Sequence, residues 1–232
     1  SSNSNIINTK VGNCLNTNLF NLYKENKSID GPRINIGGDH SMSISTIADS
    51  LNRYNNLKVI WMDAHCDINT YNSSTTKNYH GMPLSILTDI EEKKNLNFSK
   101  NKLDFDNLLY LGIRSIDAFE QDIVNRHNIK YINSTEINSN IDEVINKIDK
   151  FIKDSPVHFS FDVDSIDPKF MPSTGTKVKN GMHLEESKKI IDFIFKKNLI
   201  SFDLTELNLE IGTNEDKKKS LDNLKYLLEN YL

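Results

Sequence analysis

The sequence predicts an α/β fold of three layers, in which helices cover both faces of a mainly parallel central sheet. Short apolar runs rich in β-branched residues alternate along the chain with segments whose apolar residues recur at helical spacing. The runs are apolar at consecutive positions, which is typical of strands covered on both faces. Because a helix between two strands makes a crossover connection, neighbouring strands are expected to be parallel.

Five runs are expected to form the strands. In chain order they are 33–38 (RINIGG), 57–62 (LKVIWM), 107–113 (NLLYLGI), 157–161 (VHFSF) and 199–204 (LISFDL). Helical periodicity follows most of them and predicts four helices. The apolar residues that define these helices are Ile44, Ile47, Ala48 and Leu51; Phe119, Ile123 and Val124; Ile141, Val144, Ile145 and Ile148; and Ile190, Ile191, Phe193 and Ile194.

Three polar segments lie outside this pattern. Residues 1–30 are rich in Asn and are expected to be partly flexible, and so is the segment 91–102 (EEKKNLNFSKNK). The charged run 214–219 (NEDKKK) is expected to be a solvated loop or the start of a helix. With 232 residues and 37% hydrophobic side chains the chain is long enough for one core, so residues 1–232 are interpreted as a single domain.

The composition excludes several classes of partner. The formal net charge is -4, from 28 basic and 32 acidic residues, and neither sign forms a long block, so no attraction to nucleic acid or to a membrane surface is expected. Cys14 and Cys66 are too few for a disulfide framework and fit a reducing compartment. No apolar run is long enough to cross a bilayer, and the beginning of the chain lacks the features of a secretory signal. We therefore expect a soluble cytoplasmic protein.

Polar side chains follow four of the expected strands. Sheets of this kind bind ligands beyond the carboxyl ends of their strands. The unusual polar residues of the chain all fall there: His40 after 33–38, Asp63, His65 and Asp67 after 57–62, Asp162 and Asp164 after 157–161, and Glu206 after 199–204.

The run DAHCD at 63–67 has a spacing that lets three side chains converge. In an extended chain, residues two apart point to one side. The polar residues of the run can therefore face a common point, while Ala64 and Cys66 face away. Asp162 and Asp164 repeat this spacing on another strand.

Carboxylates gathered in a partly dry pocket need counter-charge. Two divalent cations would balance the four Asp side chains of this set, and the two neutral His side chains would complete it. Oxygen-rich ligands with one imidazole per metal suit Mn²⁺, although Zn²⁺ and Fe²⁺ stay open on ligand type alone. Two such ions roughly 3.5 to 4 Å apart can hold a bridging water and lower its pKa to about 7. The pattern therefore indicates a metal-dependent hydrolase.

Each fragment alone has a simpler interpretation. An isolated Asp-x-His or Asp-x-Asp pattern is common by chance, Asp often caps a helix that follows a strand, and a lone His40 would more often be a hydrogen-bonded core histidine. Cys66 is interpreted as a packing residue, and Trp61 and Phe161 as core residues. The metal-site interpretation depends on the fragments occurring together and in order.

Five ordered motifs resemble the ureohydrolase family, and the arginases most closely. They are GGDHS at 37–41, DAHCDINT at 63–70, HGMP at 80–83, SFDVDSIDP at 160–168 and DLTELN at 203–208. The resemblance extends from about residue 31 to residue 210 and implies one arginase-like catalytic domain. The N-terminal strand of that family is not evident upstream of residue 31, and its absence would leave an exposed sheet edge.

The resemblance also implies roles for the strand-end residues. The ligands of a centre of two Mn²⁺ ions would be His40, Asp63, His65, Asp67, Asp162 and Asp164, with the more exposed metal in the His40 group. The catalytic residues would be Asp67, His80 as a proton shuttle, and Glu206, which would bind the substrate guanidinium. The substrate-binding residues would be Asn69, Thr76, Asn78, Asp117, Thr176 and Glu206.

The leading hypothesis from this resemblance is manganese-dependent hydrolysis of L-arginine to L-ornithine and urea by a homo-oligomer, expected to be a trimer. One alternative is a ureohydrolase that acts on agmatine or another guanidino compound, and a second is a catalytically silent relative that binds metal. Asn69 and Asp117 favour arginine as the substrate. Ser115 stands where many arginases have Asp and slightly favours the first alternative.

Overall fold

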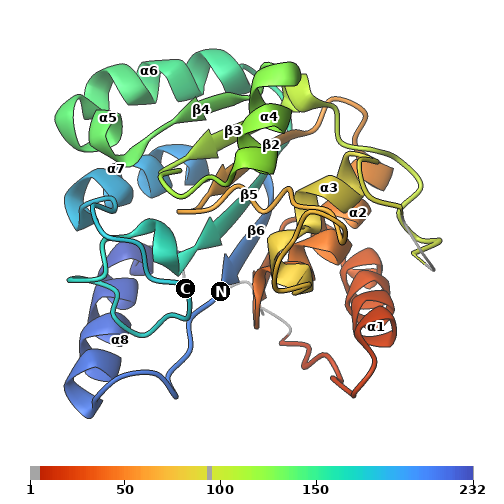
Figure 1. The fold of residues 1–232 in the computed structure, drawn as a ribbon, viewed down its shortest axis with the longest axis horizontal. Helices are drawn as coiled ribbons and strands as arrows, with labels where there is room; N and C mark the ends of the chain where they lie inside the picture. Colours follow the sequence, from red (N-terminus) through yellow and green to blue (C-terminus); the bar gives the residue numbers. More distant parts are fainter. Residues whose placement is uncertain (1–5, 93–95, 232) are drawn as a thin grey trace.

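A computed structural model describes residues 6–92 and 96–231 of the chain, and the strands of these residues form a parallel sheet. The strands are β1 Arg33–Ile36, β2 Lys58–Met62, β3 Leu108–Leu111, β4 Lys130–Ile132, β5 Val157–Asp162 and β6 Leu199–Thr205. Their order in the sheet is β1-β6-β5-β2-β3-β4, and every neighbouring pair is parallel (Figure 1). The predicted parallel sheet is confirmed.

Helices pack on both faces of the sheet, which confirms the predicted three layers (Figure 1). The core on one face contains residues of α1 Leu15–Ser28, α2 Ser43–Arg53, α3 Pro83–Leu87 and α4 Ala118–Arg126. The core on the other face contains residues of α5 Ser134–Ser139, α6 Ile141–Ile152, α7 Leu184–Phe195 and α8 Asn214–Leu228. Short 3-10 helices at His40–Met42 (η1), Tyr79–Gly81 (η2), Phe105–Asn107 (η3) and Val163–Ser165 (η4) connect these elements.

The central strand β5 presents different chemistry to the two layers. Side chains alternate between the faces of a strand. Phe159 and Phe161 therefore pack into the core on the side of α6, α7 and α8. His158 and Ser160 lie on the opposite face, where both hydrogen-bond to residues of α2. All six residues of β5 are buried, so polar groups of this strand are satisfied inside the protein.

Two segments expected to be flexible are ordered in large part. Residues 15–28 form α1, whose Leu19 and Tyr23 are buried in the core that also contains residues of α2. Phe98 is buried as well and stacks on Tyr23 with ring centroids 4.8 Å apart, so part of 91–102 is anchored in the core. Residues 1–5 and 93–95 lie outside the described part of the chain.

Three further observations concern the ends and the edges of the layers. The charged run 214–219 begins α8, which Thr213 and Asp216 cap reciprocally, so the helix-start alternative is confirmed. Strand β4 was not predicted, because its three residues are too few to give an apolar pattern. At the other edge, Ile34 and Ile36 of β1 are 45% and 67% exposed, so the expectation that every strand is covered on both faces is wrong for β1.

None of the helices in the described residues has the length and apolar character that crossing a bilayer requires.

Candidate metal centre and active site

The predicted site residues gather at one edge of the sheet. The four strands β1, β6, β5 and β2 are neighbours, and each ends at this edge because all are parallel. His40 begins η1 after β1, Asp63 directly follows β2, Asp162 ends β5, and Glu206 directly follows β6. The expectation that polar residues at the strand ends meet is confirmed by the contacts among their side chains.

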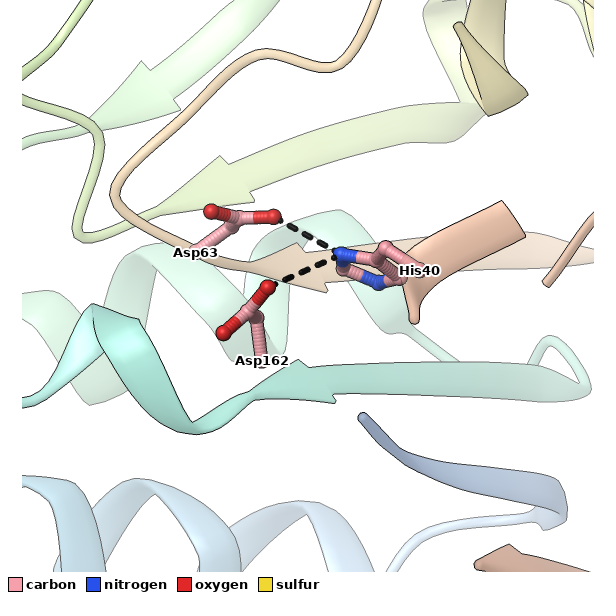
Figure 2. A group of neighbouring side chains, drawn as sticks. All are labelled: His40, Asp63 and Asp162. Atoms are coloured by element: carbon pink, nitrogen blue, oxygen red, sulfur yellow. Dashed lines mark ion pairs between the residues drawn. The ribbon is translucent and has the colours of Figure 1, made fainter. Parts of the chain in front are cut away.

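His40 lies in the first group of possible metal ligands. Its Nδ1 atom is 2.9 Å from Asp63 Oδ2 and 3.3 Å from Asp162 Oδ2, and Figure 2 shows this nitrogen directed at the two carboxylates. Asp67 Oδ2 is also 3.3 Å from the same nitrogen. Although it is buried, His40 Nδ1 has no hydrogen-bond partner in the described structure. A buried imidazole nitrogen surrounded by carboxylate oxygens is the kind of ligand set that a divalent cation binds, with the imidazole in its neutral form.

His65 lies in the second group. Its Nδ1 atom is 3.1 Å from Asp164 Oδ2 and 3.4 Å from Asp63 Oδ1. The two oxygens of Asp63 therefore face different groups, one toward His40 and the other toward His65. A carboxylate shared in this way suits two cations held side by side. The side chain of His65 is 21% exposed and that of His40 is 1% exposed, so His40 is the more buried of the two imidazoles.

Backbone groups hold the carboxylates in place. Asp63 Oδ1 accepts a hydrogen bond from the N–H of His65 at 2.7 Å, and Asp162 Oδ1 accepts one from the N–H of Asp164 at 2.7 Å. Asp67 and Glu206 have positive φ angles of 50° and 65°, which cost energy in residues other than glycine. The chain at 63–67 is therefore not extended throughout. Asp67 itself has the left-handed backbone conformation, and its carboxylate lies 3.3 Å from His40 Nδ1.

Trp61 and Ser160 fix the ring of His40. The indole of Trp61 stacks on this imidazole with centroids 3.8 Å apart and an interplanar angle of 10°. Its Nε1–H also donates to Asp63 Oδ2 at 3.0 Å, so Trp61 touches both the ring and a carboxylate of the group. On the far side of the ring, His40 Nε2 is 2.8 Å from Ser160 Oγ. Trp61 is buried as predicted, but the sequence did not indicate that it orders the site.

The crowded carboxylates raise one another's pKa values. Burial raises the pKa of Asp67 to about 7 and that of Asp164 to about 6, and the neighbouring charge of Asp63 acts in the same direction. Burial and the charge of Asp164 raise the pKa of Asp162.

The pKa values of Asp63 and of the two histidines shift in the directions that favour an ionised carboxylate beside charged imidazoles. Burial opposes ionisation of Asp63, but the close contacts of its carboxylate with His40 and His65 outweigh burial and lower the pKa of this carboxyl. Burial likewise disfavours the charged imidazole of His65, yet Asp164 and Asp63 raise its pKa to about 12. Contacts with Asp162, Asp63 and Asp67 likewise raise the pKa of His40 against the effect of burial, so the carboxylates favour the charged form of both imidazoles. Cations would take the place of these protons and relieve the repulsion between the carboxylates.

His80 and Glu206 lie beside the first group. His80 Nδ1 is 3.4 Å from Glu206 Oε1, and this contact raises the pKa of the half-buried imidazole. Glu206 Oε1 also accepts a hydrogen bond from the N–H of His40 at 2.9 Å, which ties the end of β6 to the end of β1. His80 lines a cavity of about 390 Å³ together with Asp39, Lys77 and three other residues, so space for a small ligand adjoins the pair.

The predicted substrate-binding residues are placed less uniformly. Asn69 Nδ2 donates to Asp117 Oδ2 at 2.7 Å, and Asp117 also caps α4 through a reciprocal pair with Glu120. Asn78 lines the cavity beside His80. Thr76 and Thr176 are exposed, and no hydrogen bond within the described residues joins either of them to the metal-ligand groups. Cys66 belongs to the hydrophobic core, as expected for a packing residue.

Arg114 is a site residue that the sequence reasoning missed. Its guanidinium donates to the carbonyl oxygens of Asp164 at 2.7 Å and Ser165 at 3.0 Å, and to that of Val178 at 2.8 Å. It thereby fastens the turn that carries Asp164 to the segment after it. Its place in GIRS, directly after a predicted strand, was the available signal.

The comparisons with known proteins agree with this geometry. The model of the Arginase family matches residues 5–222. The arginase of Plasmodium berghei is 38% identical over 215 residues, which are 88% of this chain and 60% of that protein. The arginase of Staphylococcus aureus (strain COL) is 38% identical over 184 residues, 77% of this chain and 61% of that protein. The chain thus spans about three fifths of the length of these curated relatives.

Solved structures give the same result at the level of the fold. The crystal structure of Entamoeba histolytica arginase in complex with L-ornithine has a TM-score of 0.83 and 32% sequence identity, with 91% of this chain and 75% of that chain covered.

Proposed function

Because the chain belongs to the arginase family, we propose that it hydrolyses L-arginine to L-ornithine and urea at a centre of two Mn²⁺ ions. The observation that carries the proposal is the position of Asp63, whose two oxygens face His40 and His65 respectively. The ligands of the centre would be His40, Asp63, His65, Asp67, Asp162 and Asp164.

The choice of Mn²⁺ follows from the ligand chemistry. Each group offers one imidazole and several carboxylate oxygens, and neither group contains a thiolate. Mn²⁺ favours such oxygen-rich sets, whereas softer ions favour sulfur. When bound, two ions at this position would acidify water and so supply a nucleophile at neutral pH. Asp67, which lies beside the first group, would accept a hydrogen bond from that water.

Glu206 is proposed to bind and orient the guanidinium of the substrate. A guanidinium is planar, always charged, and can donate two parallel N–H bonds to one carboxylate. Hydrogen bonds from His80 and from the N–H of His40 lower the pKa of Glu206 against the effect of burial, so this carboxylate is charged at neutral pH. Binding there would hold the guanidinium carbon next to the ligand groups.

His80 is proposed to carry the proton that the departing amine requires. Its contact with Glu206 raises the imidazole pKa above 6.5, which favours a protonated ring near neutral pH. The ring is 35% exposed, so it can exchange protons with solvent between turnovers. Positioned acids of this kind contribute about 10²- to 10⁴-fold to the rate.

Recognition of the amino acid end is assigned to a second group of residues. Asn69 and Asp117 are joined by their hydrogen bond and would contact the α-carboxylate and the α-amine, with Thr76, Asn78 and Thr176 around them. Binding of L-ornithine by the arginase of Entamoeba histolytica supports a product of this type. We also propose that the protein is a homotrimer of the cytoplasm, which light scattering and fractionation can check.

The decisive test compares two substrates with protein loaded with Mn²⁺. L-arginine should release urea much faster than agmatine, because agmatine lacks the carboxylate for which Asn69 is proposed. The opposite order would favour the alternative of another guanidino substrate, for which Ser115 is a possible cause. His80→Ala should lower the rate by about 10²-fold or more while Mn²⁺ stays bound. An unchanged rate in that variant would contradict the role given to His80.

A further inference from the structure

A buried polar network lies between α2 and the sheet, on the side of His40 that faces away from the carboxylates. Its centre is Asp203 of β6, which is completely buried. Asp203 Oδ2 accepts hydrogen bonds from Ser43 at 2.9 Å and Thr46 at 2.5 Å, and it is 3.0 Å from His158 Nε2. Its other oxygen accepts from Asn35 at 2.8 Å. None of these residues was singled out by the sequence.

One branch of the network runs from Asp203 to His40. Ser43 Oγ lies 3.1 Å from Ser160 Oγ, and Ser160 Oγ lies 2.8 Å from His40 Nε2. The branch therefore links a buried carboxylate to a candidate metal ligand through two hydroxyl groups. Asp203, Ser43 and Ser160 are each 0% exposed, so bulk water does not compete for the hydrogen bonds of this branch.

The direction of the hydrogen bonds follows from the chemistry of a carboxylate. Ionised Asp203 can only accept, so Ser43 must donate its single hydroxyl hydrogen to it. Ser43 Oγ is then an acceptor toward Ser160, and Ser160 satisfies it by donating. Ser160 Oγ is left as an acceptor toward His40, which places a hydrogen on Nε2. An imidazole with hydrogen on Nε2 presents the lone pair of Nδ1 to a cation.

We propose that Asp203 is a positioning residue that acts through Ser43 and Ser160 to hold a hydrogen on His40 Nε2 and so to reserve Nδ1 for a metal ion. This inference rests on the proposed metal centre. It goes beyond that proposal because it assigns the control of one ligand to Asp203, a carboxylate that belongs to neither ligand group and reaches His40 only through two hydroxyl groups.

The anchor is well suited to this role. Burial opposes the charge of Asp203, but His158, Thr46 and Asn35 lower its pKa, so the carboxylate stays an acceptor. A buried charge held in this way is weak evidence for stability by itself, because apolar replacements are often neutral or better. Control of the hydrogen on His40 Nε2 would explain why a charged residue, and not an apolar one, occupies the position of Asp203.

The test compares two hydroxyl deletions on the same helix. Ser43→Ala removes the link between Asp203 and Ser160, whereas Thr46→Val removes a hydroxyl that bonds the same oxygen outside that link. Both residues are fully buried and both variants lose one hydrogen bond to Asp203. Mn²⁺ is titrated into the metal-free protein and each variant, with free Mn²⁺ followed by its paramagnetic resonance signal, and melting temperatures are recorded alongside.

We expect Ser43→Ala to weaken one of the two Mn²⁺ binding steps by about 10-fold, as other outer-shell changes do, and to leave the second step unchanged. Thr46→Val should change neither step by more than about 2-fold at a similar loss of melting temperature. In protein loaded with diamagnetic Zn²⁺, the Nε2 hydrogen of His40 should exchange with solvent faster in Ser43→Ala than in Thr46→Val.

Equal affinities in the two variants, or equal weakening of both steps, would overturn the role of Asp203 while the proposed function stands. Failure of the unsubstituted protein to bind Mn²⁺ would overturn both. A variant that does not fold is replaced by Ser160→Ala, which breaks the same branch at its next member and carries the same expectations.

Discussion

The two faces of β5 and β6 are equally buried but chemically opposite. On the side of α6, α7 and α8, Phe159, Phe161 and Phe202 pack together with ring centroids 5.4 to 6.5 Å apart. On the side of α2, the alternate residues include His158 and Asp203, which hydrogen-bond to each other and to that helix. The same two strands thus carry a hydrophobic core on one face and a polar network on the other.

One sheet can thus separate stability from chemistry. Burial of aromatic side chains contributes free energy without demanding exact partners. A buried polar group demands a partner of defined direction, and that demand is what places hydrogens and lone pairs. We therefore expect changes on the apolar face to alter the free energy of unfolding and changes on the polar face to alter metal binding.

The largest effect on metal binding is expected from Asp63→Asn. Asp63 faces both ligand groups, so its loss removes an anionic oxygen from each. Because changes outside the ligand sphere already cost 10- to 100-fold, the loss of affinity for Mn²⁺ should exceed about 100-fold. The matched control is Met62→Leu, since Met62 is the preceding residue and points to the apolar face. Calorimetric titration should find unchanged Mn²⁺ binding in the control, and weakened binding there would break the division.

Phe202→Ala should have the largest effect on stability. Phe202 is completely buried and contacts three other aromatic rings. Removing such a side chain costs about 3 to 5 kcal/mol of unfolding free energy. Urea denaturation measures this cost, and the number of Mn²⁺ ions bound per folded chain should not change. A fall in that number at concentrations where the variant is folded would show that the two faces are coupled.

The pH dependence of metal-free protein should be unusual in sign. Asp164 and Asp67 have pKa values of about 6 and 7 in place of 3.8, so the folded chain holds protons that the unfolded chain releases. Their contribution to stability is complete below about pH 4 and is lost as the pH rises through 6 and 7. The raised pKa of His65 acts in the same direction above pH 6.5.

Metal-free protein should therefore melt at a higher temperature at pH 5 than at pH 8. Mn²⁺ should raise the melting temperature, and by more at pH 8, where fewer protons must leave. Scanning calorimetry at both pH values, with and without Mn²⁺, tests this. A larger increase at pH 5 would mean that the carboxylates of the two groups do not bind the ion.

The smallest effect is expected for a polar contact at the surface. Arg126 and Asp122 form an ion pair one turn apart on α4, with side chains 63% and 55% exposed. Exposed pairs of this spacing contribute about 0.3 to 0.5 kcal/mol. Asp122→Ala should change the unfolding free energy by no more than that and leave Mn²⁺ binding untouched. A loss of unfolding free energy several times larger would show that exposed polar contacts contribute as much to stability as buried ones.

The sequence predicted that the polar side chains at the strand ends converge, because their position depends on two local features. Apolar runs mark the strands, and the parallel arrangement sends the residues after each run to one edge. His40, Asp63 and Asp162 meet there as expected. The burial of the two imidazoles could not be predicted in this way, because it depends on which segments fold over each histidine.

The polar network could not be predicted from the sequence in the same way. Ser160 and Asp203 become neighbours only through the register of β5 and β6, and Ser43 reaches them only after α2 packs on that face. The alternation of polar and apolar residues in VHFSFD and LISFDLT was the one available signal. Helix α1 was missed for another reason, since its many Asn residues hide the apolar positions that anchor it.

The proposed centre holds two cations at the edge where β1, β6, β5 and β2 end, and these cations serve the release of urea. The most direct measurement is a titration of metal-free protein with Mn²⁺ in the presence of L-arginine, with urea formation recorded at each ratio of metal to chain. Our account predicts that the rate rises and reaches its plateau at two Mn²⁺ ions per chain. A plateau at a single ion, or no urea at any ratio, would contradict it.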